Sequence, residues 1–139
     1  MKVDHFLDTN ILVYAFSNVE EESRKQARAK QIVASVDFGI SGQVLAELYV
    51  SLTRKSHIGL SPEKALAVIQ DLKATPCVIV DFQLVEAGIR MSQRYQTSYW
   101  DGAILAAAEH LGAKIVYSED MSHGQRYGSV TVENPFLEL

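Results

Sequence analysis

Four acidic residues stand at positions where their side chains could do chemistry together: Asp8, Glu47, Asp101 and Asp120. Asp8 interrupts the mostly apolar run HFLDTNILVYAF, where an unpaired charge near a core costs on the order of several kcal/mol. Like charges held close together raise one another's pKa, so clustered carboxylates are partly protonated or bind a divalent cation. Because every ligand would be an oxygen atom, Mg2+ or Mn2+ is favoured over zinc. A cation held in this way can promote hydrolysis of a phosphodiester bond.

Each of these acids also has an ordinary structural explanation. Asp8 could cap the helix that follows it, and Asp101 could complete a capping box with Ser98. Asp120 could belong to a turn, and Glu47 could be an acid on a solvated helix surface. Taken one at a time, these explanations account for all four residues. What favours a shared site is that the four acids fall together near the ends of expected strands or on the helices that follow them.

The helix expected to contain Asp101 strengthens the hypothesis of a shared site. Ile104, Leu105 and Ala108 follow Asp101 at helical spacing, so the apolar face of this helix also carries the carboxylate. A carboxylate on a buried face is costly unless it has a partner. The alanines at 103 and 106–108 would let this helix lie close to its neighbours, which would bring the acids closer together.

Strands and helices are expected to alternate along the chain. Strands are expected at residues 3–7, 37–41, 77–82, 114–117 and 129–132, and helices at 20–36, 43–55, 62–73 and 83–95, with two more beginning near 11 and 98. The apolar run CVIVDF predicts a strand that is buried on both faces. The pattern predicts a single-domain three-layer α/β/α fold with a mainly parallel central sheet. In such folds, ligands bind beyond the carboxyl ends of the strands, near the point where the strand order reverses.

Length, charge and cysteine content narrow the class of protein. The 139 residues have the size of one ordinary domain, and the single cysteine, Cys77, excludes an internal disulfide and is expected to be a small buried hydrophobe. No apolar run approaches the roughly 18 residues of a membrane span, and the first residues lack a signal-peptide pattern, so a cytoplasmic location is expected. The net charge of -4 argues against binding nucleic acid by overall attraction, and a cation bound at the acids would answer that objection.

The order and spacing of four segments resemble the PIN-domain family of metal-dependent ribonucleases, in particular the small VapC-like toxins of toxin–antitoxin pairs. The segments are FLDTNILVYAF, VLAELYV, SYWDGAILAAAEHLGAKIVYSEDM and ENPF. The resemblance covers nearly the whole chain and implies one PIN-like nuclease domain over residues 1–139. It also implies an RNA substrate, a cognate antitoxin, and a homodimer formed through the helices between residues 20 and 75.

The resemblance implies roles for the acids. Asp8, Glu47, Asp101 and Asp120 would be the family's acidic quartet. Asp8, Asp101 and Asp120 would hold Mg2+ or Mn2+, while Glu47 would bind a second ion or position the attacking water. The neighbouring Glu119 could replace or assist Asp120.

Small polar residues beside the acids match positions at which the family places similar residues. Thr9, Asn10 and Ser118 would orient the carboxylates through hydrogen bonds. Capping and turn formation are the alternative roles for these three residues.

Basic residues near the expected site are candidates for RNA contact: Arg24, Lys25, Arg28, Arg54, Lys55, His57 and His123. A charged helix is more often a solvated surface, and the same residues could instead contact an antitoxin. Tyr99 and Trp100 precede Asp101 and are expected in the core or at the rim of the site rather than as a platform for stacking bases.

Two other functional classes compete with the ribonuclease. A signalling receiver domain also gathers acids around Mg2+ and could use Asp81 as its phosphoacceptor, but it requires a pair of acids after the first strand, and here Thr9 and Asn10 follow Asp8. A phosphatase of the haloacid type is disfavoured because position 10 is Asn rather than Asp. The third class is an inactive PIN-like binding module, against which the presence of all four acids argues.

Overall fold

The central sheet has six strands in the order β3-β2-β1-β4-β6-β5. The computed structural model describes residues 2–17, 19–54 and 58–139. The strands are β1 His5–Leu7, β2 Phe38–Ser41, β3 Cys77–Val78, β4 Ile115–Tyr117, β5 Arg126–Tyr127 and β6 Val130–Glu133. All neighbouring strands are parallel except β5 and β6, which pair antiparallel. The prediction of a mainly parallel sheet is therefore confirmed.

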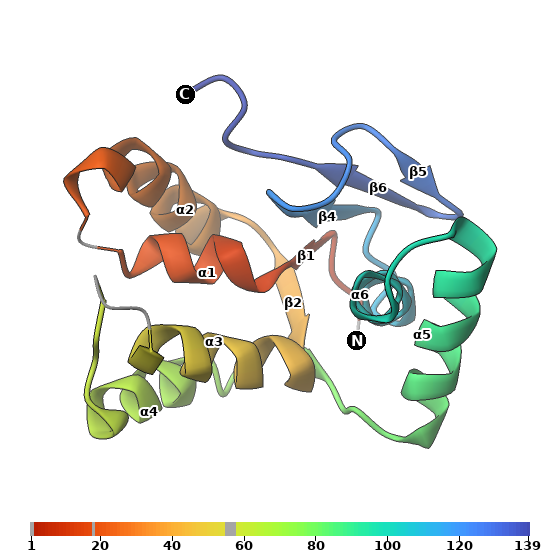
Figure 1. The fold of residues 1–139 in the computed structure, drawn as a ribbon, viewed down its shortest axis with the longest axis horizontal. Helices are drawn as coiled ribbons and strands as arrows, with labels where there is room; N and C mark the ends of the chain where they lie inside the picture. The colour runs from red at the N-terminus through yellow and green to blue at the C-terminus, as the bar shows by residue number, and fades with distance from the viewer. Residues whose placement is uncertain (1, 18, 55–57) are drawn as a thin grey trace.

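Helices cover both faces of this sheet. They are α1 Thr9–Ala15, α2 Ser23–Ser35, α3 Gly42–Arg54, α4 Pro62–Asp71, α5 Phe82–Tyr95 and α6 Tyr99–His110, with the short 3-10 helix η1 at Glu20–Glu22. Figure 1 shows α1 to α4 on one side of the sheet and α5 with α6 on the other, which is the predicted three-layer α/β/α arrangement. None of the described helices combines the length and the apolar character needed to cross a membrane.

The helix α6 is buried over most of its length because its residues are small or apolar. Residues 102–108 are all buried, and Ser98 caps the helix by accepting a hydrogen bond from the Asp101 main-chain nitrogen at 3.1 Å. A Cβ atom at Gly102 would lie 2.5 Å from the carbonyl oxygen of Gly88 in α5, so only glycine allows the two helices to approach this closely. The predicted close packing of α6 against its neighbours is confirmed.

The order of the strands reverses between β1 and β4. From β1 the chain proceeds outward through β2 to β3, and it then returns along α5 and α6 to place β4 on the other side of β1. Leu7 at the end of β1 pairs with Tyr117 at the end of β4. The carboxyl ends of these two strands are thus neighbours at the switch point, where ligands bind in open α/β sheets.

The strand predicted at residues 77–82 is confirmed only at its first two residues. Only Cys77 and Val78 form β3, while the side chains of Ile79 and Val80 are 78% and 47% exposed. The reason is that β3 is an edge strand with β2 as its single neighbour, so its apolar composition does not mean burial on both faces. The short antiparallel strand β5 was not predicted, and the helix after β1 begins at residue 9 rather than near 11.

Candidate active site

Asp8 lies between the ends of β1 and β4 and is held by both. Its main-chain nitrogen donates to the Tyr117 carbonyl at 3.0 Å. Its side chain caps α1 by accepting from the Thr9 nitrogen at 2.8 Å, and the Ser118 hydroxyl donates to the other carboxylate oxygen at 2.7 Å. The capping role proposed as an alternative is therefore real, and it coexists with a position at the switch point.

The pKa of Asp8 is raised to about 6, chiefly by burial and to a smaller extent by the negative charges of Asp120 and Glu47. The hydrogen bonds from Ser118 and Thr9 oppose this shift without cancelling it. An acid with a pKa near neutrality at the switch point of a sheet is unusual for a purely structural cap.

Asn10 connects Asp8 to the turn that carries Asp120. Its side-chain nitrogen donates to Asp120 Oδ2 at 3.1 Å and to Asp8 Oδ2 at 3.4 Å, while its side-chain oxygen accepts from the Glu119 main-chain nitrogen at 3.2 Å. Ser118 Oγ also accepts from the Asp120 nitrogen at 3.2 Å. Asn10 and Ser118 therefore hold two carboxylates in a fixed relation, and both residues act across the ends of β1 and β4.

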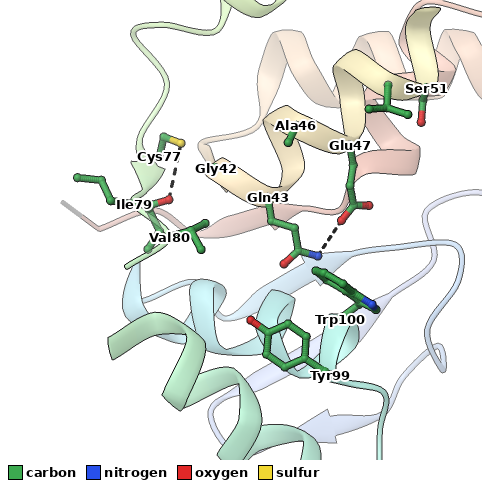
Figure 2. A pocket seen from close by; sticks show the side chains of 12 residues that line it. Gly42, Gln43, Ala46, Glu47, Ser51, Cys77, Ile79, Val80, Tyr99 and Trp100 are labelled. Carbon is green, nitrogen blue, oxygen red and sulfur yellow. Dashed lines mark hydrogen bonds between the residues drawn. The ribbon is translucent and has the colours of Figure 1, made fainter. Parts of the chain in front are cut away.

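Glu47 approaches the same region from α3. The Thr9 hydroxyl donates to Glu47 Oε2 at 3.4 Å, and the Gln43 amide donates to Oε1 at 2.7 Å, the interaction drawn in Figure 2. Glu47 is exposed, and its neighbour one turn earlier, Val44, is fully buried. The carboxylate thus lies at the margin of the apolar face, as the helical spacing indicated.

Asp101 completes the group from the first turn of α6. Burial raises its pKa, the charge of Asp120 adds to this effect, and a hydrogen bond with Ser98 lowers it in part. Because Asp120 acts on both Asp8 and Asp101, and Glu47 acts on Asp8, the four acids share one region of negative potential. Within the described part of the chain, no lysine or arginine forms a salt bridge with any of the four.

The acids do not form a closed metal cage. No set of three or more Asp, Glu, His or Cys side chains among the described residues is arranged so that it could hold a metal ion as it stands. The carboxylates are electrostatically coupled and hydrogen-bonded to small polar residues, but they are not gathered around one point.

Glu119 has partners quite different from those of Asp120. Its carboxylate accepts from the Tyr14 hydroxyl at 2.6 Å and pairs with Lys25 Nζ at 2.5 Å. The Lys25 amine also lies 4.9 Å from the centre of the Tyr14 ring. The two adjacent acids of the turn therefore face separate sets of groups, and nothing in the sequence distinguishes them.

The other residues predicted to contact RNA lie in varied surroundings. Arg24 and Arg54 are exposed, whereas Arg28 donates to the carbonyl of Pro135 at 3.4 Å. Lys25 is engaged with Glu119, as described above. His123 Nδ1 accepts from the main-chain nitrogen of Asn134 at 2.9 Å. Lys55 and His57 lie outside the described residues.

An open cavity of about 1140 Å³ adjoins the acids on the side of α3. Gln43 and Glu47 line it from α3, Ile79 and Val80 from the segment after β3, and Trp100 from the start of α6. Figure 2 shows these side chains around the cavity. Trp100 is 63% exposed, so of its two predicted locations the rim is correct and the core is wrong. Sequence reasoning did not single out Gln43, whose role is visible only once α3 is placed beside the cavity.

Comparisons with known proteins agree with this arrangement. The PIN-domain family matches residues 5–126, a range that contains all four acids, and no curated protein matches the sequence. The fold is similar to VapC20 of Mycobacterium tuberculosis, described as a sarcin-ricin loop cleaving toxin, with a TM-score of 0.66, 21% identity, and coverage of 84% of this chain and 90% of that one. It is also similar to a chain of a toxin–antitoxin complex from Klebsiella pneumoniae, with a TM-score of 0.67, 21% identity and coverage of 96% and 98%.

A third solved structure, DNA-bound VapBC of Salmonella typhimurium, has a TM-score of 0.63 at 21% identity, with coverage of 96% of this chain and 98% of that one. At such identities the likeness is one of fold. The receiver alternative is not supported, because the family that matches is the PIN domain and because Asp81, which caps α5, follows the edge strand β3 rather than a strand of the switch point. With the family pattern spanning most of the chain and the acids at the switch point, this protein belongs to the PIN-domain family.

Proposed function

We propose that this protein is an endoribonuclease that hydrolyses RNA phosphodiester bonds with the help of Mg2+ or Mn2+, and that residues 1–139 form one nuclease domain. The single observation that carries the proposal is the state of Asp8. This half-buried carboxylate has its pKa raised to about 6, and it shares the side chain of Asn10 with Asp120 and the residue Thr9 with Glu47 at the switch point of a PIN fold. Its electrostatic cost favours the binding of a cation at this position.

The donor set fits a hydrated hard cation rather than a fully enclosed one. Mg2+ is commonly bound through one or two carboxylates while it retains several waters, so it does not need three acids already converging. Asp8 and Asp120, linked by Asn10, would supply such a pair of oxygen ligands, and the charge of Asp120 also acts on Asp101. When bound, the cation would supply positive charge to a phosphoryl oxygen and make a nearby water more acidic.

The residues of the chain would then orient the reactants. Thr9, Asn10 and Ser118 hold Asp8 and Asp120 in position through hydrogen bonds. Glu47 is exposed and held by Gln43, which suits it to position the attacking water or to bind a second ion. These roles agree with the chemistry of hydrolysis by an activated water.

The structural relatives support a more specific biological role. One is described as a toxin that cleaves the sarcin-ricin loop, and others are toxin–antitoxin complexes, some of them bound to DNA. We therefore propose that this chain is the toxin of a type II pair, that a cognate antitoxin binds it, and that it acts in the cytoplasm. A homodimer is proposed on the same ground, and Tyr49 and Leu66 are exposed apolar side chains on α3 and α4 that such an assembly would cover.

The proposal is tested by incubating the purified protein with a mixed RNA pool and Mn2+. Wild type should cleave, whereas EDTA or Asp101→Asn should abolish cleavage. Calorimetric titration with Mn2+ of wild type and Asp8→Asn provides a second measurement. Cleavage that persists in EDTA would disprove metal dependence, and Mn2+ binding without cleavage of any RNA would identify an inactive binding module.

A further inference from the structure

One wall of the cavity beside the acids is aromatic and is formed by Tyr99 and Trp100, the two residues before Asp101. Trp100 is the residue immediately before Asp101, and the opposite wall includes Glu47. Of the four acids, Glu47 lines the cavity, and Trp100 connects the cavity wall to the first turn of α6, which carries Asp101. An RNA strand whose phosphodiester bond lies at the acids must place its next nucleotide close to this opening.

Trp100 is unusually exposed for a residue at the start of a buried helix. Its ring is 63% accessible and meets the Tyr99 ring edge to face, with centroids 5.1 Å apart and planes inclined at 70°. An exposed indole beside a nucleic-acid site is suited to stack on an unpaired base, since every base offers a flat π-face. Figure 2 shows the Trp100 and Tyr99 rings on the same side of the cavity.

The charge of the cavity lining favours the uncharged base of a nucleotide over its phosphate. Glu47 carries negative charge into it, and no lysine or arginine among the residues that the structure describes lines it. A phosphate group would be repelled, whereas the uncharged base of the same nucleotide would not. The Gln43 amide donates one hydrogen bond to Glu47, and its carbonyl oxygen has no partner among the described residues, so this oxygen is available to the edge of a base.

From these observations we infer that the cavity binds an unpaired nucleobase of the RNA, stacked on Trp100 and bonded at its edge by Gln43. The inference rests on the proposed ribonuclease function and adds the subsite that holds the nucleotide flanking the cleaved bond. The volume of about 1140 Å³ is large enough for a nucleobase with its sugar.

A second copy of this chain is the competing occupant. Ile79 and Val80 line the far wall, and the neighbouring Phe82 is 82% exposed, so an apolar protein surface could also cover this region. The base is favoured at the Trp100 end because that end adjoins the acids and contains the unpaired oxygen of Gln43. The two occupants are separable by experiment.

The emission of Trp100 provides a direct test because it is the only tryptophan in the chain. Full-length Asp101→Asn protein in Mg2+ is titrated with a short single-stranded RNA, so that binding is observed with the cation present and without cleavage. Stacking should quench the emission, and an oligonucleotide of the same length built of abasic sugar-phosphate should not. Quenching by the abasic strand, or no quenching by the RNA, would overturn the inference.

Variants separate the role of the indole from general effects. Trp100→Ala should weaken RNA binding by about 10-fold and raise KM more than it lowers kcat, as expected for loss of one stacking contact. Trp100→Phe should recover part of that loss. Phe82→Ala removes a more exposed aromatic ring outside the cavity lining and should leave both the quenching and KM unchanged.

The outcomes distinguish this inference from the proposed function. Cleavage that depends on Asp8 but is indifferent to Trp100→Ala would retain the ribonuclease and reject the base subsite. Quenching by RNA in a protein that never cleaves would retain the subsite and reject the hydrolysis. Emission that changes with protein concentration in the absence of RNA, and is abolished by Phe82→Ala, would show that a second copy covers the cavity instead.

Discussion

Two regions at the carboxyl ends of the strands depart from the usual burial of apolar residues and exposure of polar ones. They depart from it in opposite ways. At the ends of β1 and β4, polar side chains are buried: Ser118 is fully inaccessible and Thr9 nearly so. At the end of β3, large apolar side chains are exposed, including Ile79 and Phe82. In the first region, hydrogen bonds within the chain offset the free-energy cost of burying polar groups. The second has no covering group within the described chain and is suited to an external partner.

The two regions therefore favour different kinds of binding partner. The carboxylates at β1 and β4 already have hydrogen-bond donors, so what they lack is positive charge. The apolar groups near β3 lack contact area rather than charge. One region therefore favours a cation and the other an apolar or aromatic surface.

The largest expected effect comes from removing a charge at the first region. Asp8→Asn should reduce the rate of RNA cleavage by about 1000-fold or more, because the variant loses a ligand for the cation. Asp81→Asn is the matched control, since Asp81 also follows a strand of this sheet but only caps α5, and asparagine caps helices equally well. The measurement is the initial rate of cleavage of one RNA by wild type and by each variant at a fixed concentration of Mn2+. Equal losses in both variants would mean that the acids act through the fold.

The second effect concerns stability and its dependence on pH. The pKa of Asp8 is raised in the folded protein to about 6, so between its ordinary value and pH 6 the folded state binds more protons than the unfolded state. Without divalent cations, wild-type stability should therefore fall as pH rises from about 4 to 7. Asp8→Asn removes this loss and should be more stable than wild type by about 1–3 kcal/mol at pH 8.

Urea unfolding at pH 4 and pH 8 in EDTA measures this difference. The two proteins should have similar stability at pH 4, where Asp8 is largely protonated when folded. Added Mn2+ should stabilise wild type and not the variant, because a ligand that binds only the folded state shifts the equilibrium towards it. A variant that is less stable than wild type at both pH values would show that Asp8 is simply a cap.

The first region could be predicted from the sequence because its signals are local. Asp8 and Asp120 follow apolar strands, and the alternation of strands with helices places such positions at one sheet edge. The direction of each side chain could not be predicted. Asp120 faces Asn10, whereas Glu119 faces Tyr14 and Lys25, and these partners come from helices distant in the sequence.

The second region was misread for a related reason. An apolar run such as CVIV has the same composition in a central strand and at a sheet edge. Only the pairing partners decide between them, and β3 pairs with β2 alone. The strand β5 escaped prediction because it has two residues, and its place depends on pairing with β6 rather than on its own composition.

A smaller effect is expected from the group that holds Glu119. Asn10 and Tyr14 lie one turn apart on α1 and both bind the turn after β4, so the Tyr14 hydroxyl helps to fix the carboxylate of Asp120 indirectly. Tyr14→Phe should lower the cleavage rate by about 3- to 10-fold, in line with one lost hydrogen bond. Lys25→Met should have a similar effect. Lys30 is an exposed lysine on α2, the helix that also carries Lys25, and Lys30→Met should have no effect. Equal losses for both lysines would indicate general attraction of RNA rather than positioning.

The smallest effect should come from the second region. Ile79→Thr replaces a side chain that is 78% exposed and lies beyond the last paired residue of β3, so the free energy of unfolding should change by less than about 0.5 kcal/mol. Ile40→Ala is the buried control from β2, next to β3, and should cost about 2–4 kcal/mol. Urea titrations at two protein concentrations measure both. A loss above about 1 kcal/mol for Ile79→Thr that grows with protein concentration would mean that this surface is already covered by another copy. The two regions would then both be buried, the polar one within the chain and the apolar one between two copies of it.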